Sequence, residues 1–424
     1  MSQPTSGPER QAAIYLGGVS GRRPRVPTAM GALEAAAQRA MSREAFAYVA
    51  AGAGNETTKR ANEESFKRWR IVPRMLRDTS DRDTSVELFG RRLHTPLLLA
   101  PLGVLEIVHR DAERAVARAA AAQGVPMIFS NQASTPMEDC AQAMGESPRW
   151  FQLYWSISDE LVESLVGRAE ACGCEAIVIT LDTTILGWRT RDLDVAYLPF
   201  LRGQGIAQYT SDPAFQRLLD RDSTEPAAPA PRPNLRALGA LIELARRYPD
   251  RLWPALRSGR ARRAVERFVQ IYSRPALTWE NLPFLRQRTR LPILLKGLLD
   301  PDDARRAADL GMDGVIVSNH GGRQVDGAIA TIDALPGVVE AVGDQFPVLL
   351  DSGVRGGADV FKALALGATA VCIGRPYLWG LAVAGEGGVR EVIQNFAADF
   401  DLTMGLAGCR SVAEIGPEAL VRGP

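Results

Sequence analysis

The sequence predicts an α/β fold: a (β/α)8 TIM barrel with an N-terminal helical segment and a long insertion in the fourth βα loop. Eight short apolar runs suggest strands buried on both faces, as in a parallel sheet. Helical stretches rich in Ala, Arg and Glu lie between most of these runs. The runs are 96–100, 126–130, 150–154, 176–180, 292–296, 314–318, 347–351 and 370–374, and the clearest helical stretches are 111–123, 159–171, 302–310 and 357–366.

Segments before and after the repeats complete the predicted organisation. Helices are expected over 30–41 and 43–51, ahead of the first strand, where they would plug or cover the barrel. A helix over 389–407 would close the barrel. We therefore divide the chain into an N-terminal helical segment leading into the barrel (1–95), the barrel (96–410) and a C-terminal tail (411–424).

The spacing of the repeats breaks between the fourth and fifth runs. Residues 199–290 are far longer than the 2–6 residues usual for a βα loop. The Pro/Ala-rich stretch 223–233 predicts an exposed, mobile linker, with helices over 235–247 and 262–272 around it. On the active face of a barrel this insertion would form a lid or an oligomer contact, and the alternative is a solvated surface insertion.

Composition limits the classes of function. Of 424 residues, 46% are hydrophobic and 23% charged, an ordinary globular balance. Lys and Arg total 50 against 49 Asp and Glu, so no global field favours nucleic acid or a membrane surface. No apolar run reaches the roughly 18 residues of a membrane span, and residues 1–30 lack the apolar core of a secretion signal, which predicts a cytoplasmic protein. The five cysteines show no CxxC pair, so we expect reduced, mostly buried thiols and no metal site.

Polar residues end nearly every apolar run, and strand ends form the active face of a barrel. The most informative stretch is Ser-Asn-His-Gly-Gly-Arg-Gln (318–324), directly after the sixth run. His320 is placed as a proton acceptor, the two glycines allow close approach of a ligand, and Arg323 can bind a carboxylate in bidentate fashion. The other histidines, His94 and His109, flank the first run in loops and carry no such pattern.

Glycine-rich loops follow the seventh and eighth runs, at 350–357 and 373–376. Loops at these two positions form the recurrent phosphate site of TIM barrels, where backbone amides and helix N-termini hold the anion. Arg355 and Arg375 would add positive charge. Lys296 ends an Ile-Leu-Leu run and must therefore reach a polar partner.

These motifs resemble those of the FMN-dependent α-hydroxy-acid oxidising enzymes, over about residues 45–410. Ser-Asn-His-Gly-Gly-Arg-Gln matches the active-site signature of that family, and Asp-Ser-Gly-Val-Arg (351–355) with Gly-Arg-Pro (374–376) matches its phosphate motifs. Stretches 148–155, 186–192 and 198–203, together with the long insertion, are most similar to the lactate 2-monooxygenase branch. The resemblance implies FMN as cofactor, a 2-hydroxy acid and oxygen as small-molecule partners, and a homotetramer or octamer.

The resemblance also implies roles for matched residues. His320 would take the substrate hydroxyl proton as hydride moves to flavin N5, with Asp182 stabilising its imidazolium form. Arg323 and Arg189 would hold the substrate carboxylate. Tyr48 would help these arginines hold the carboxylate, and Tyr154 would hydrogen-bond the substrate oxygen. The residues implied for FMN are Pro101, Leu102, Gly103, Ser130, Gln152, Thr180, Lys296, Ser318, Asp351, Ser352, Gly353, Arg355, Gly374 and Arg375.

Some of these assignments have structural alternatives. Arg189 and Arg191 both sit near the predicted mouth, so one of them is open to a role as a surface salt-bridge partner. Tyr48 could be a helix-packing aromatic and Asp182 a helix cap. Within the insertion, Tyr197 and Tyr209 would shape the pocket, although neither lies in a clear motif.

The predicted reaction is oxidation of an L-2-hydroxy acid to a 2-keto acid, with flavin reoxidised by oxygen. Departures from the family pattern are Gln132 for tryptophan, Leu102 for a polar residue, and Gly103 for the alanine of glycolate oxidase. With the branch-like stretches, Gly103 favours a lactate 2-monooxygenase-like outcome, oxidative decarboxylation to a shorter carboxylic acid. One alternative is an oxidase or dehydrogenase for a bulkier substrate, giving keto acid and hydrogen peroxide. Another is a barrel that binds flavin or a phosphorylated ligand without turnover.

Overall fold

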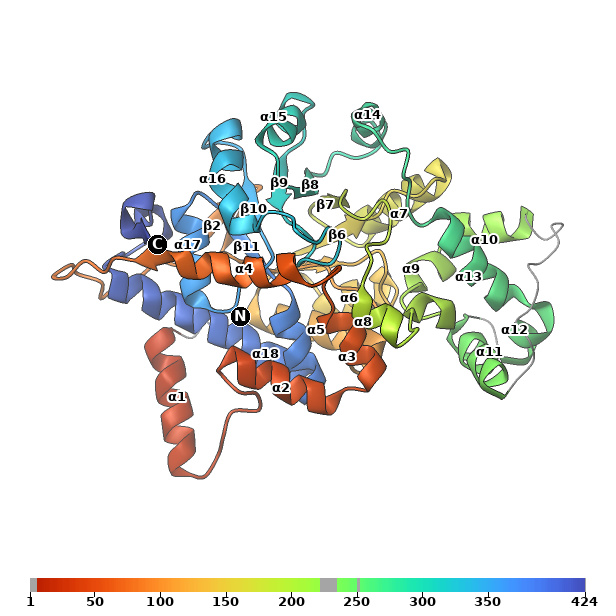
Figure 1. The fold of residues 1–424 in the computed structure, drawn as a ribbon, viewed down its shortest axis with the longest axis horizontal. Coiled ribbons are helices and arrows are strands. Elements are labelled where there is room, and N and C mark those ends of the chain that lie inside the picture. Colours follow the sequence, from red (N-terminus) through yellow and green to blue (C-terminus); the bar gives the residue numbers. More distant parts are fainter. Residues whose placement is uncertain (1–5, 222–234, 250–251, 424) are drawn as a thin grey trace.

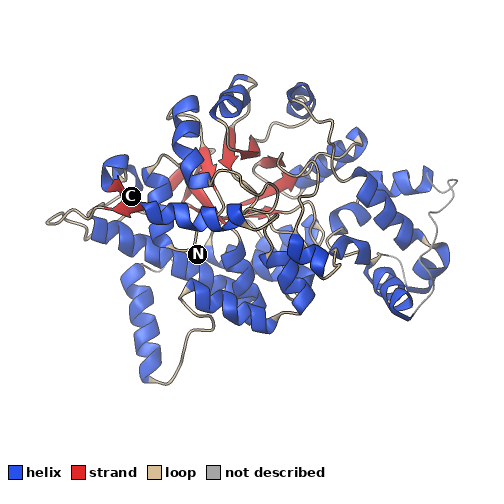
Figure 2. Cartoon of the chain, in the orientation of Figure 1, coloured by secondary structure: helices blue, strands red, loops and turns tan. Residues whose placement is uncertain are grey.

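The computed structural model describes residues 6–221, 235–249 and 252–423, and its centre is a closed barrel of eight parallel strands. The barrel order follows the chain, so each strand pairs with the next and β11 pairs with β4. Helices surround the strands (Figures 1 and 2). Each predicted apolar run overlaps one strand: β4 (Leu97–Leu99), β5 (Met127–Phe129), β6 (Arg149–Leu153), β7 (Ile177–Thr180), β8 (Ile293–Leu298), β9 (Gly314–Val317), β10 (Val348–Leu350) and β11 (Ala370–Ile373).

The strand β8 differs from the prediction because it does not end at Lys296. It continues to Leu298 through a shift in its register with β9 at Lys296/Leu298. Gly297 in this bulge has a φ of +105°, a backbone conformation that L side chains rarely adopt. The bulge places Lys296 inside the strand, opposite Thr180 of β7.

A β-hairpin, rather than the predicted helices, plugs the amino-terminal end of the barrel. The hairpin consists of β2 (Val86–Leu88) and β3 (Arg91–Leu93). Leu88 and Leu93 join the buried residues that fill the barrel interior, and the ring of Phe89 packs 5.6 Å from that of Trp150. Strand β4 begins four residues after the hairpin ends, so the segment directly before the first barrel strand closes this end of the barrel.

Helices cover the outside of the barrel. The last of them, α18, begins at Arg375 rather than near residue 389 as predicted. It is interrupted at Ala384 and Gly385 and then continues to Ala407. Within the described residues, no helix is both long and apolar enough to cross a bilayer. The covering helices are α5 (Ala112–Gln123), α6 (Met137–Met144), α7 (Asp159–Ala171), α15 (Pro301–Asp309), α16 (Thr331–Val342), α17 (Gly357–Ala365) and α18 (Arg375–Ala407).

The N-terminal segment holds two helices that we predicted and two that we did not. α2 packs against α18, whereas α3, begun by a Ser42 side chain that accepts from Ala45 N, lies at the mouth of the barrel. Strands β1 (Trp69–Ile71) and β12 (Leu420–Arg422) pair antiparallel and so join the segment after α4 to the C-terminal tail. The helices are α1 (Gly7–Val19), α2 (Met30–Ala40), α3 (Arg43–Ala50) and α4 (Thr57–Arg68).

The insertion between β7 and β8 is helical, and its helices α10 to α13 gather on one side of the barrel (Figure 1). The predicted linker 223–233 lies outside the described residues, whereas both predicted helices are present. The elements are α8 (Thr190–Asp194), α9 (Ala207–Thr210), α10 (Pro213–Arg221), α11 (Leu235–Arg247), α12 (Leu252–Ser258), α13 (Arg260–Ile271) and α14 (Leu282–Arg286).

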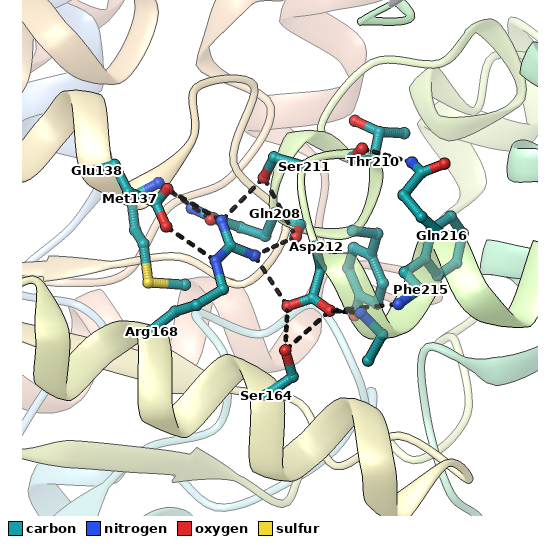
Figure 3. A network of polar contacts seen from close by, with 12 residues as sticks. Met137, Glu138, Ser164, Arg168, Gln208, Thr210, Ser211, Asp212, Phe215 and Gln216 are labelled. Carbon is teal, nitrogen blue, oxygen red and sulfur yellow. Dashed lines mark hydrogen bonds and ion pairs between the residues drawn. The ribbon is translucent and has the colours of Figure 1, made fainter.

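A buried ion pair ties the insertion to the barrel helices (Figure 3). Arg168 of α7 donates to Asp212 at 3.0 Å and to Glu138 of α6 at 2.8 Å. Asp212 is fully buried and also accepts from Ser164 and from the backbone amide of Ala214, in the first turn of α10. Because a buried carboxylate is stable only when paired, this network fixes the start of α10 against α7.

Candidate active site

A single cavity at the carboxyl ends of the strands brings together all of the predicted site residues except Asp182 and Ser318. Its lining includes residues from loops that follow seven of the eight strands and Lys296 from within β8, as expected for the active face of a barrel. The predicted residues that line it are Tyr48, Pro101, Leu102, Gly103, Ser130, Gln152, Tyr154, Thr180, Arg189, Lys296, His320, Arg323, Asp351, Ser352, Gly353, Arg355, Gly374 and Arg375.

Asp182 lies behind His320 and orients its ring. Its Oδ1 is 2.7 Å from His320 Nδ1, and Thr183 donates to the same oxygen at 2.9 Å. Burial opposes ionisation of Asp182, but the charges of His320 and Lys296 and these hydrogen bonds outweigh it and lower the pKa of Asp182 to about 2. An ionised carboxylate can only accept, so Nδ1 of His320 carries the proton and Nε2 is left as the acceptor.

The environment of His320 keeps the imidazole neutral. Burial lowers the pKa of His320 below its ordinary value, and the opposing effect of Asp182 does not overcome it. Burial, reinforced by the charge of Asp182, raises the pKa of Tyr154, so this phenol keeps its proton. The lining of the cavity therefore includes both a proton acceptor and a hydroxyl donor.

Two guanidinium groups, those of the buried Arg189 and the half-buried Arg323, face the same cavity. Arg189 donates to the Arg323 carbonyl at 3.2 Å and to Gln324 Oε1 at 3.0 Å, and Arg323 donates to the Tyr48 carbonyl at 2.7 Å. Neither forms an ion pair with any residue that the structure describes. Burial and the charge of Arg189 lower the pKa of Arg323 to about 10, so a bound anion would relieve an existing repulsion. Arg191, the alternative to Arg189, pairs with Glu56 instead.

Tyr48 and Asp182 are both placed by contacts beyond their own elements. Tyr48 lies under the Arg323 guanidinium at 5.2 Å, and Tyr197 meets its ring edge-on at 6.5 Å. Asp182 contacts His320, and the nearest following helix, α8, begins at Thr190 with Arg189 at its N-cap position, so the helix-cap alternative is wrong. Tyr48 both packs and lines the cavity.

Lys296 has two polar partners, of which Asp351 also lines the cavity. Its Nζ lies 3.0 Å from Asp351 Oδ2 and donates to Ser318 Oγ at 2.7 Å. Burial opposes its charge, but Asp351 and Asp182 outweigh burial and raise the pKa of Lys296. Ser318 is fully buried and does not line the cavity, so it supports Lys296 rather than meeting a ligand there.

Two polar atoms in the cavity lack hydrogen-bond partners among the described residues. They are Gln152 Nε2 and Thr180 Oγ1, and both side chains are buried. The other end of the Gln152 amide accepts from the Asn131 amide at 3.1 Å, which orients Nε2. Because buried polar groups are normally paired, these two atoms indicate a polar ligand.

The loops after β10 and β11 form a positively charged end of the cavity. Arg375 donates to the carbonyls of Val49 and Ala51, at 3.0 and 2.9 Å. Burial, with the charges of Arg323 and Arg355, lowers the pKa of Arg375 to about 9. Helices α17 and α18 begin beside these loops, so their amide ends add to the field that would hold a phosphate.

The sequence of the chain is similar to those of known proteins along most of its length. Residues 37–422 match the family model of the FMN-dependent dehydrogenases. The chain belongs to the FMN-dependent dehydrogenase family. It is 42% identical over 413 residues to an FMN-dependent alpha-hydroxy acid dehydrogenase of Penicillium citrinum, covering 97% of this chain and 95% of that protein. It is 41% identical to the L-lactate oxidase of Lysinibacillus sphaericus, covering 93% of each.

Solved structures agree with this assignment. A mandelate oxidase with (S)-4-hydroxymandelic acid superposes with a TM-score of 0.76 at 36% identity, covering 93% of this chain and 98% of that one. The chain is therefore an FMN-dependent 2-hydroxy-acid oxidoreductase, built on the predicted TIM barrel.

The cavity of this member of the FMN-dependent dehydrogenase family fits the cofactor of that family. The unpaired atoms of Gln152 and Thr180 suit the polar edge of a flavin, and the excess positive charge at Arg375 suits a phosphate. Gly353 has a φ of +87°, and a Cβ there would lie 2.3 Å from the Asn62 carbonyl, so the phosphate loop needs glycine at this position.

Several lining residues of the family member were not predicted. Thr183 and Gln132 lie within two residues of the predicted Asp182 and Ser130, and that proximity was a usable signal. The insertion contributes Leu198, Phe200, Phe268, Val269 and Tyr272. The two insertion residues that we predicted to shape the pocket do not line it. Tyr197 instead donates to Gln204, and the hydroxyl of Tyr209 accepts from Asn131, because both side chains turn into the packing of the insertion.

Proposed function

We propose that this protein oxidises L-2-hydroxy acids to 2-keto acids. The observation that carries the proposal is that one cavity is lined by a neutral His320, whose Nε2 is free to accept, and by Arg189 and Arg323, which form no ion pair among the described residues. One group is suited to a hydroxyl proton and the other to a carboxylate. A 2-hydroxy acid carries both on adjacent carbons, so it satisfies both at once.

In this proposal each side chain has one task. Arg189 and Arg323 bind and orient the substrate carboxylate, as planar guanidinium groups do best. Tyr154 donates to the substrate oxygen, and His320 accepts the hydroxyl proton at Nε2. Asp182, ionised, then stabilises the imidazolium ion.

FMN, when bound, accepts the two electrons that leave the substrate carbon. Gln152, Thr180, Ser130 and the 101–103 backbone would hold its ring, and Lys296 would place a positive charge beside it. The loops containing Ser352, Gly353, Arg355, Gly374 and Arg375 would hold its phosphate.

Oxidative decarboxylation, as in lactate 2-monooxygenase, is the second candidate. The observation in its favour is that insertion residues line the cavity, since a covered cavity would retain a keto acid until oxygen reacts. Gly103 does not add to this argument. A Cβ there would lie 2.4 Å from the Gln132 carbonyl, so local packing alone explains the glycine.

Product analysis under air separates these outcomes. The holoenzyme is incubated with a panel of L-2-hydroxy acids and catalase, because peroxide itself decarboxylates keto acids. Keto acid as the product, with peroxide detected in a parallel reaction without catalase, supports an oxidase. A shorter carboxylic acid with carbon dioxide, formed although catalase is present, supports decarboxylation. If no acid bleaches the flavin absorbance without air, the proposed function is wrong and a non-catalytic flavin-binding barrel is favoured. The cytoplasmic location and homo-oligomeric assembly stay predictions.

A further inference from the structure

We propose that the insertion helix α13 forms the wall of a subsite for the substrate side chain, and that this wall selects L-2-hydroxy acids with a bulky apolar side chain over glycolate and lactate. This inference rests on the proposed function. Phe268, Val269 and Tyr272 of this segment line the cavity. Leu198 and Phe200, from the start of the insertion, line it as well.

Aromatic contacts make the wall continuous. The ring of Phe268 stacks on Tyr272, with centroids 5.2 Å apart and planes inclined by 23°. On its other side Phe268 contacts Phe200, also at 5.2 Å. Tyr209 meets the same ring edge-on from behind at 4.8 Å. Phe268 is only 1% exposed, so its orientation is determined by packing and does not wait for a ligand.

Hydrogen bonds attach the end of α13 to the two segments that hold the proposed catalytic groups. The Ile271 carbonyl accepts from Ser156 Oγ at 2.7 Å, two residues after Tyr154. Ser273 Oγ donates to the Thr184 carbonyl at 3.0 Å, two residues after Asp182. Tyr272 lies between these anchors, which places the wall beside the part of the cavity that would contain the reacting carbon.

The far side of the insertion is anchored as well. The network of Arg168, Asp212 and Ser164 in Figure 3 fixes the start of α10, and α10 packs against α13. The wall therefore has supports on both sides and is preformed. A preformed apolar surface binds an apolar group without first ordering its own side chains.

The chemistry of the wall defines the substrate class. The arginines and the histidine contact the carboxylate and hydroxyl that every 2-hydroxy acid shares, so they do not discriminate between side chains. Five apolar or aromatic side chains contribute to the remaining wall, and burying a phenyl or branched alkyl group there is favourable. We expect kcat/KM for L-phenyllactate to exceed that for glycolate by about 10- to 100-fold, the discrimination that hydrophobic pockets reach.

Val269 offers a test that the fold should tolerate, because it is 44% exposed and lines the cavity. Val269→Asp should lower the phenyllactate-to-glycolate ratio of kcat/KM about tenfold, since the new charge must lose water when an apolar group binds. Val421→Asp is the matched control. Val421 is 51% exposed on β12 and outside the cavity, so the ratio should stay within twofold.

A binding measurement supplements turnover. Phenylacetate and acetate, which are not oxidised, are titrated into the holoenzyme and detected by perturbation of the flavin spectrum. Wild type should bind phenylacetate at least tenfold tighter than acetate, and Val269→Asp should reduce that preference. Equal binding of the two acids, or a preference unchanged by the substitution, would overturn the inference. Turnover that favours glycolate would overturn it too, yet leave the proposed function standing. Absence of any turnover would contradict the proposed function, and the binding arm would still decide the subsite.

Discussion

Asp182 and His320 meet at 2.7 Å although they follow β7 and β9, with β8 between them. The bulge in β8 makes this approach possible. A Cβ on Gly297 would lie 2.8 Å from Asp182 Cβ, so a side chain there would displace the carboxylate from the imidazole. The pair therefore depends on an irregularity in the strand that separates its two members.

The carboxylate of Asp182 should be essential for proton transfer but not for FMN binding. Asp182→Asn removes the charge that stabilises the imidazolium ion and favours the wrong tautomer. We expect anaerobic flavin reduction to slow by about 10²–10⁴-fold, the contribution of general base catalysis, because His320 no longer acts as an effective base. Stopped-flow absorbance measures it. Asp344→Asn, at an exposed position, should leave the rate unchanged, and a reduction rate retained in Asp182→Asn would contradict the assignment.

The rate of flavin reduction should rise from acid pH to a plateau. His320 must be neutral to accept a proton, and burial lowers its pKa, so the midpoint should fall below the ordinary value of about 6.5. In Asp182→Asn the midpoint should move to still lower pH, since the carboxylate raises the pKa of His320. A pH profile of the limiting reduction rate measures both. A midpoint above 6.5 in wild type would show that the imidazole is stabilised in its charged form.

Replacing Lys296 should affect both the flavin and the fold. Lys296→Met leaves Asp351 buried without its partner, 3.0 Å away in the native protein, and should cost about 3–5 kcal/mol of unfolding free energy. It should also slow flavin reduction and weaken the flavin–sulfite adduct, because a positive charge favours both. Sulfite titration and urea unfolding measure these effects. Lys67→Met, on the exposed side of α4, is the control, and normal sulfite binding in Lys296→Met would remove Lys296 from the flavin site.

The insertion should depend on Asp212 for its attachment. Asp212→Ala removes a buried partner of Arg168 and the cap of α10, and we expect a loss of about 3 kcal/mol in unfolding free energy. Glu160→Ala, which breaks exposed ion pairs with Arg217 and Arg221, should cost less than about 1 kcal/mol. Denaturant unfolding of the two variants compares them, and similar small losses would mean that the buried network does not hold the insertion.

Gly103 should be required for packing under the cofactor. Gly103→Ala places a methyl group 2.4 Å from the Gln132 carbonyl, and the backbone must shift at a cost of about 1–3 kcal/mol. We expect weaker FMN retention on dilution, measured by flavin fluorescence. Gly31→Ala on α2, where a Cβ meets nothing within 4 Å, should be neutral or slightly stabilising. Undiminished FMN retention in Gly103→Ala would show that the loop adapts.

Much of the site could be predicted because a parallel barrel places every strand end on one face. Residues as distant as Gln152, Lys296 and Arg375 could be assigned to one cavity from their position after an apolar run. Lys296 could be predicted as a site residue although its strand continues past it, since its side chain still lines the cavity and pairs with Asp351. The stretch 318–324 predicted His320 as the proton acceptor for the same reason, because it directly follows the sixth apolar run.

From the sequence alone came the barrel, the order of its strands and the polar groups at their ends, because period and strand polarity are local properties that the closed sheet repeats eight times. Only the tertiary structure decided which insertion residues reach the cavity. Phe268 and Tyr272 line it, whereas Tyr209 does not line it and packs against the ring of Phe268. It also separated Arg189 from Arg191 and withdrew Ser318 beneath Lys296. These outcomes depend on how a helix is rotated by distant contacts, such as Arg168 with Asp212, and no repeat in the chain encodes that rotation.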